Sequence, residues 1–341
     1  MIAPILPFAL IALLPLPLLG LGALWGGIWV WLGLAYVSLF AFGVDEAVSW
    51  TTAPADPDQP LPGADTLSVV LALGHFALLG LAVAGLAGTT GLAGAERVGL
   101  FLGAGLYIGQ VSVANAHELI HRTHRGLFGL GKWVFISMLY GHVTTSHRLL
   151  HHAHVATPED PNFPPRGTSF YRYLPRSMWG NLTRGFAVEQ ARAKLSGRRN
   201  PYIEYGVGAA AFVALAGLGF GWAGVGALVG LGLYAQMQHA LVDYLQHYGL
   251  QRRKLANGRY EPQGPQHSWN SPHWFTSFMA VNVTRHSDHH AHPGRKYPAL
   301  QLDNAMPRLP YSLPAMGVIA LIPPLWFRMM DRRVARVLAD G

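Results

Sequence analysis

Three short stretches of the chain place histidines at spacings that can bind metal ions. His117 and His121 are four residues apart, so in a helix both imidazoles lie on one face, about one turn apart. The second stretch, HRLLHH (147–152), repeats this spacing and adds an adjacent histidine. The third, HSDHH (286–290), has histidines three and four residues apart. Chance would have to produce a helical spacing three times, so we interpret these histidines as metal ligands.

The number of histidines separates two kinds of metal site. HELIH (117–121) alone also matches the HExxH motif of zinc proteases, in which Glu118 would be the general base. A zinc protease needs only three protein ligands. The three clusters and His247, which lies one helical turn after Asp243, make nine imidazoles, too many for one ion. Imidazole alone does not select the metal, but nine ligands favour a redox pair. His239 is about 12 Å along a helix from His247 and cannot share its metal.

Carboxylates near the clusters are candidate acceptors for the second ring N–H of ligating histidines, which would fix each ring's tautomer and orientation. The candidates are Glu118, Asp160, Asp243 and Asp288. The alternative is that these acids form structural ion pairs with Arg122, Arg148 or Arg285.

The remaining histidines fall into two sets. Those that flank a cluster could assist the metal site: His124, His154 and His292. The others are expected to be amphipathic side chains with a hydrated tip near the membrane interface: His75, His142, His267 and His273.

The composition of the chain indicates which kind of structural element positions these histidines. Of the 341 residues, 51% are hydrophobic and only 12% are charged, against about a quarter charged in a soluble domain. The chain has no cysteine, which excludes disulfides, zinc fingers, thiolate-held iron–sulfur clusters and thiolate-ligated haem. Net charge is +8, and all Lys and Arg residues except Arg97 follow residue 116. The composition predicts a membrane protein with a basic, histidine-rich face.

Six apolar segments have roughly the 20 residues needed to cross a bilayer. We therefore predict one all-α membrane domain, 1–341, with about six transmembrane helices. Leu21 would mark the tight turn of the first pair, and glycines near 219–224 the turn of the last pair. The first segment lacks a basic start and a cleavage site, so we read it as a retained span. The predicted spans are 2–20, 22–42, 66–88, 97–116, 203–222 and 223–245.

The clusters can act together only if they lie on one side of the membrane. Residues 126–142 are therefore expected to be re-entrant or interfacial, and residues 311–327 are interrupted by prolines. By the positive-inside rule the cap, residues 117–202 and 246–341, would face the cytoplasm of a bacterial inner membrane. The segment 43–65 would lie on the same side, although it carries five acids and no Lys or Arg.

The three clusters resemble the boxes of the membrane di-iron family that includes fatty-acid desaturases and hydroxylases. Longer motifs are similar to the integral-membrane alkane 1-monooxygenases, and the resemblance runs from about residue 110 to 305. These motifs are VATPEDP (155–161), DYLQHYGL (243–250), RHSDHHAHP (285–293) and RKYPALQ (295–301). The resemblance implies six spans that form a funnel, with hydrocarbon below two irons. The iron ligands it implies are His117, His121, His147, His151, His152, His247, His286, His289 and His290.

The resemblance implies oxidation of a terminal methyl group of an alkane or alkyl chain to a primary alcohol, with O2 as co-substrate. Two positions depart from the family, Ser146 in place of an acid and Leu150 in place of a glycine, but neither is a ligand. Desaturation or hydroxylation of a fatty-acyl lipid, or hydroxylation of a methyl group on an aromatic ring, would use the same metals. A zinc hydrolase is a more distant alternative.

An alkane has no polar group, so its selection depends on the shape of an apolar channel. Trp25, Trp29 and Trp31 are candidates for limiting chain length, with lipid-facing positions as the alternative.

Electrons must come from outside, because the chain has neither cysteines nor a dinucleotide-binding fingerprint. The resemblance suggests a rubredoxin, and a ferredoxin would also serve, each with its reductase. Basic residues of the cap could dock it or contact anionic lipid, and no nucleic-acid partner is expected. They are Arg122, Arg125, Arg166, Arg172, Arg176, Arg198, Arg199, Arg252, Arg253 and Lys254.

Overall fold

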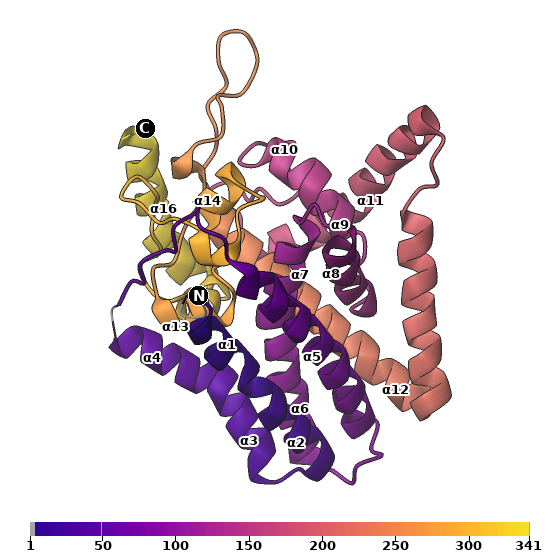
Figure 1. Ribbon diagram of the computed structural model, residues 1–341. Helices are drawn as coiled ribbons and strands as arrows, with labels where there is room; N and C mark the ends of the chain where they lie inside the picture. The colour runs from indigo at the N-terminus through magenta and orange to yellow at the C-terminus, as the bar shows by residue number, and fades with distance from the viewer. Residues whose placement is uncertain (1–3, 49, 341) are drawn as a thin grey trace.

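The computed structural model describes residues 4–48 and 50–340. In this part of the chain the regular secondary structure is helical apart from two isolated β-bridges. The prediction of an all-α membrane protein is confirmed. Residues 2 and 3 of the first predicted span and residue 341 of the predicted cap lie outside the described residues. In Figure 1 long helices form a bundle, and the shorter helices gather at one end of it as a cap.

The first two spans form a hairpin that turns later than predicted. Its first span covers Leu6–Trp25 and its second Ile28–Ala47. The turn is at Gly26 and Gly27, whose φ angles are +65° and +58°, so the prediction of a turn at Leu21 was wrong. Only glycine adopts such angles at low cost. The helices of this hairpin are α1 (Leu6–Leu13), α2 (Pro15–Trp25), α3 (Ile28–Ala35), η1 (Tyr36–Phe40) and α4 (Ala41–Ala47).

The second pair of spans is longer than predicted at three of its four ends. The first of the pair is α5, Pro62–Leu86, and the second runs from Gly94 to Ile120. The predicted bounds were 66–88 and 97–116. The first span begins earlier than predicted because a proline, here Pro62, is tolerated in the first turn of a helix. The extension to Ile120 puts His117 on the last turn of a span. The second span comprises α6 (Gly94–Tyr107), the π-helix η2 (Ile108–Ser112) and α7 (Val113–Ile120).

The third pair of spans is one helix that folds back on itself. α12 covers Tyr202–His247, and Gly221, with a φ of +63°, breaks it into two arms. Figure 1 shows the second arm running back across the bundle toward the cap. Even the shorter arm, 202–220, is about 29 Å long at 1.5 Å per residue, enough to cross the hydrocarbon. Five described helices qualify as spans, and α12 supplies two crossings, which gives the predicted six.

Two further apolar segments do not cross straight through. α8, Arg125–Ser137, has 13 residues and is only about 20 Å long, in agreement with the interfacial prediction. α15, Leu313–Ala320, and α16, which begins at Pro323 and ends at Asp340, meet at an angle of 120°.

The cap is anchored to the spans at Asp45, near the end of α4. Its carboxylate accepts hydrogen bonds from the backbone N–H groups of Phe275 (2.8 Å) and Thr276 (3.0 Å), which caps α13. The cap helices are α9 (Val143–Ser146), the π-helix η3 (His147–His151), α10 (His152–His154), α11 (Phe170–Ser196), η4 (Pro265–His267), α13 (Trp274–Met279), α14 (His286–Ala291) and η5 (Tyr297–Ala299).

Candidate metal centre

All nine histidines singled out by the sequence converge in the cap and divide into two groups. Within each group one ring nitrogen per residue lies within 4.8 Å of every other. The groups are neighbours, since the ring centroids of His152 and His290 are 4.6 Å apart. The five-histidine group is His117, His121, His147, His152 and His289, and the four-histidine group is His151, His247, His286 and His290.

Nitrogens of the five-histidine group face one another at short distances. The Nε2 atom of His147 lies 2.7 Å from that of His117 and 2.9 Å from that of His152. The Nε2 atoms of His152 and His289 are 3.2 Å apart. The Nε2 atom of His121 is buried with no partner among the described residues.

The four-histidine group repeats this geometry. His286 Nε2 lies 2.9 Å from His247 Nε2 and 3.0 Å from His290 Nε2. The Nε2 atoms of His151 and His290 are 3.1 Å apart.

These distances fit metal coordination better than hydrogen bonding between rings. A neutral imidazole has a single N–H, so a ring whose Nε2 faces two others leaves lone pairs opposed. Two nitrogens bound at about 2.1 Å to one ion and at right angles to each other are about 3.0 Å apart. The observed separations of 2.7–3.2 Å bracket that value. Both groups therefore have the donors and the spacing to hold a metal ion.

Two short helices contribute to both groups. α14 gives His289 to one group and His286 and His290 to the other. The segment from η3 into α10 gives His147 and His152 to the first group and His151 to the second. The i, i+4 pair of the second box is thus split, because the π-helical turn brings residues five apart onto one side.

Burial keeps most of these rings neutral. Removal from water, reinforced by neighbouring imidazoles, holds the pKa values of His147, His152 and His289 well below the ordinary histidine value. His151 is the exception. Burial also disfavours its charged form, but the charge and hydrogen bond of Asp160 outweigh burial and raise its pKa. Neutral imidazole is the form that binds metals.

Asp160 lies where a carboxylate would orient a metal ligand. Its Oδ2 accepts a hydrogen bond from Nδ1 of His151 at 2.8 Å, and its Oδ1 accepts one from the backbone N–H of Asn162 at 2.9 Å. Asn162 donates from Nδ2 to Asp243 (2.9 Å) and accepts from Ser177 (2.6 Å). Both oxygens of Asp160 are therefore engaged in a buried network that fixes the His151 ring.

The other three predicted acceptors contact no histidine of either group among the described residues, so their prediction was wrong. Glu118 pairs with Arg122, one turn further along, and accepts from the backbone of Tyr297 at 3.0 Å. Asp288 pairs with Arg295 and accepts from His292. Asp243 points to Asn162. Each of these carboxylates accepts hydrogen bonds from other donors that the fold brings closer than the histidines of the two groups.

The flanking histidines stay outside both groups. His124 accepts from the backbone N–H of Leu127 at 3.4 Å, His154 is exposed, and His292 bonds to Asp288 at 2.9 Å.

The hydrated tip predicted for four other histidines is wrong for three of them. His75 is fully buried, 2.8 Å from the Ser137 hydroxyl. His267 is also buried and contacts Glu261 at 3.2 Å. Each of these two has a polar partner distant in sequence or across a turn. His142 is partly exposed, but its Nε2 atom is buried. His273 is partly exposed.

The predicted channel tryptophans lie on the outside of the first hairpin. Trp25 is 70% exposed and Trp31 44%, and Trp29 is partly buried. Smaller residues of the same hairpin, such as Ala23 and Val30, occupy the interior. Trp25 and Trp31 are exposed on the surface of the hairpin, and the channel prediction fails for them.

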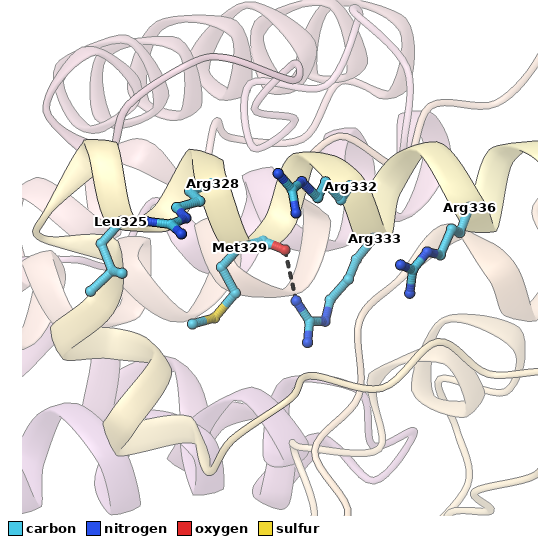
Figure 2. Close-up of a pocket in the computed structure, with 6 residues that line it drawn as sticks. All are labelled: Leu325, Arg328, Met329, Arg332, Arg333 and Arg336. Atoms are coloured by element: carbon cyan, nitrogen blue, oxygen red, sulfur yellow. Dashed lines mark hydrogen bonds between the residues drawn. The ribbon is translucent and has the colours of Figure 1, made fainter.

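A row of arginines on α16 was missed by the sequence reasoning. Arg328, Arg332, Arg333 and Arg336 line a hollow of about 290 Å³, and Figure 2 shows their side chains along this helix. The spacing of four residues between Arg328, Arg332 and Arg336 in an amphipathic segment was the available signal. Some of the predicted cations are instead paired inside the protein, for example Arg122 with Glu118.

Comparison with known proteins agrees with this site. The fatty acid desaturase family model matches residues 92–319. Alkane 1-monooxygenase 2 of Pseudomonas aeruginosa is 33% identical over 95% of this chain and 90% of its own length. Alkane 1-monooxygenase of Acinetobacter baylyi is 36% identical over 70% of the chain, which spans 59% of that relative. The xylene/toluene monooxygenase hydroxylase component XylM of Pseudomonas putida is 27% identical over 92% of the chain and 84% of its length. The chain belongs to the fatty acid desaturase family and is a relative of the alkane 1-monooxygenases.

Proposed function

We propose that the protein is a membrane monooxygenase that converts the terminal methyl group of an alkane or alkyl chain to a primary alcohol. The reaction consumes one O2, two electrons and two protons, and it releases one water. The observation that carries the proposal is the division of nine imidazoles, seven of them from buried residues, into two neighbouring groups. Relatives named alkane 1-monooxygenase support this substrate class.

Two iron ions are the proposed cofactors, one per histidine group, and when bound they supply the redox chemistry that activates O2. The protein holds them with His117, His121, His147, His152 and His289, and with His151, His247, His286 and His290. Asp160 keeps the lone pair of His151 Nε2 directed into its group by accepting from Nδ1. Seven of these nine histidines are buried, which limits the access of bulk water to the reacting centre.

The membrane spans support an apolar substrate. His117 and His247 lie on the last turns of α7 and of the second arm of α12, so the metal groups sit where spans meet the cap. A hydrocarbon dissolved in the bilayer can approach the groups from between these helices. It offers no polar handle, so its position depends on apolar contacts alone.

Electrons are proposed to come from a rubredoxin or a ferredoxin with its reductase. The chain contains no cysteine for a cluster of its own. The arginine row of α16 provides positive charge for an acidic donor protein (Figure 2). The excess of Lys and Arg in the cap supports a cytoplasmic metal site in a bacterial inner membrane.

The test is turnover with labelled oxygen. Purified enzyme with a reductase and donor protein is incubated with octane, hexadecane, xylene and a fatty-acyl substrate under 18O2. Label in a primary alcohol from an alkane supports the proposal. An unlabelled alkene from the acyl substrate would instead identify a desaturase, and one zinc per chain without iron would end the di-iron assignment.

Hydroxylation of a methyl group on an aromatic ring is the second candidate. The similarity to XylM over 92% of the chain favours it. Labelled methylbenzyl alcohol from xylene, with no octanol from octane, would select it.

A further inference from the structure

A second basic hollow, lined by no histidine of either group, lies where the cap meets the first arm of α12. Its volume is about 520 Å³, and α8, η3, the end of α11 and the start of α12 form its walls. In Figure 1 the end of α11 lies above the start of α12. We call it the interfacial hollow. Its cations are Lys132, Arg148, Arg192, Arg198 and Arg199.

The charges of the interfacial hollow are not balanced within the protein. Two carboxylates line it: Glu204 pairs with Lys132 at 2.5 Å, and Glu189 lies 3.4 Å from Arg192. Arg148, Arg198 and Arg199 have no carboxylate within 4.0 Å in the described part of the chain. Three guanidinium groups therefore share one concave site, and an anion is the complement that such a site fits.

The position of the hollow at the end of a membrane span, next to exposed apolar side chains, indicates which kind of anion binds there. Pro201 and Tyr205 line it, at the start of the first arm of α12, which is long and apolar enough to cross a membrane. Leu195, which also lines it, is 89% exposed, and Ile203, on the first turn of α12 between the lining residues Pro201 and Glu204, is 61% exposed. A soluble anion would leave both side chains in water. A phospholipid would cover them with its acyl chains while its phosphate meets the arginines.

We propose that the interfacial hollow binds the headgroup of an anionic phospholipid. The phosphate accepts hydrogen bonds from Arg198 and Arg199, and Arg148 completes the positive wall. The acyl chains lie along Leu195 and Ile203 toward the first arm of α12.

The experiment measures lipid retention by the full-length protein. Wild type is placed in nanodiscs of phosphatidylcholine containing 20% phosphatidylglycerol, then released and examined by native mass spectrometry. The test variant carries Arg198→Gln and Arg199→Gln. The control carries Arg328→Gln and Arg332→Gln, which removes the same charge from the hollow of α16. Each lost arginine should weaken binding about fivefold, or about 30-fold for the pair.

The expected result is a phosphatidylglycerol adduct on wild type and control that is lost from the test variant. Equal retention by all three proteins, or equal retention of phosphatidylcholine, would overturn the proposal. Displacement of the adduct by 10 mM inorganic phosphate alone would reassign the hollow to a soluble anion. If the test variant kept its lipid but lost electron transfer from an acidic donor protein, the hollow would be a docking site instead.

Discussion

Replacing Asp160 by asparagine should weaken metal binding by the four-histidine group without removing any ligand. Asp160 accepts from His151 Nδ1 through one oxygen, at 2.8 Å, and from the backbone of Asn162 through the other, at 2.9 Å. Asparagine offers only one acceptor oxygen. Its NH2 group must therefore face either the His151 N–H or the Asn162 N–H, and one donor is left without a partner.

The size of the effect follows from these two contacts. Loss of the negative charge converts a charge-assisted hydrogen bond to a neutral one, which costs about 1 kcal/mol. An unsatisfied buried donor adds about 1–3 kcal/mol, part of which reorientation of the network can recover. We expect a loss of metal affinity of about 10- to 100-fold, the range measured when a partner of a metal-binding histidine is removed.

The assay is competition for Fe(II) between anaerobic, metal-depleted protein and a chromophoric chelator. Asp288→Asn is the control, since Asp288 is also a buried carboxylate in the cap but contacts Arg295, His292 and the backbone of Gln301. Wild-type affinity in Asp160→Asn, or the same loss in both variants, would refute the role of Asp160 in orienting His151.

Four further outcomes are expected. Purified protein should contain about two iron ions per chain by elemental analysis, and a chelator should lower its thermal midpoint because the nine imidazoles lose the ions that they bind. His247→Ala should abolish turnover and lower iron content, whereas His239→Ala, two turns away on the same helix and outside both groups, should keep its iron; equal iron in both would remove His247 from the site. Gly221→Ala should destabilise the protein by about 1–2 kcal/mol, because alanine resists a φ of +63°, and Gly219→Ala, which has open space around its Cβ, should not; calorimetry of both checks this. His154→Ala should retain most turnover, since this exposed residue lies outside both groups.

The sequence predicted which histidines meet but not how they divide. Box spacing shows that His147, His151 and His152 lie on one helical segment. It cannot show that a π-helical turn sends His151 to a different group from the other two. That division depends on backbone geometry and on which element packs opposite, and neither is encoded in local spacing.

The positions of the turns and of the orienting acids were harder to predict for physical reasons. Gly20, Gly22, Gly26 and Gly27 are all candidates for the first turn, and only the last two have positive φ angles. Gly22 stays helical and lets α3 approach, because a Cβ there would lie 3.0 Å from the backbone nitrogen of Val30. A carboxylate near a histidine cluster accepts from whichever donor the tertiary fold brings closest. Proximity in the sequence therefore does not show which carboxylate will accept a hydrogen bond from a ligating histidine.

Three connections between spans lie at the end of the bundle opposite the metal groups (Figure 1). Their composition affects how the protein inserts into the membrane. Gly26–Gly27, residues 87–93 and Gly221 contain no charged side chain. Moving a charged residue into the hydrocarbon costs about 2.5–3.5 kcal/mol during insertion, so each hairpin can enter the bilayer as a unit with few charges to carry across. The charges next to these turns are Glu96 and Arg97, which hydrogen-bond with the backbone of Gly27 and Leu92. With the cap on the cytoplasmic side, as proposed above, it remains throughout on the side where the ribosome releases it. In that orientation, biosynthesis never has to translocate the segments that form the metal centre.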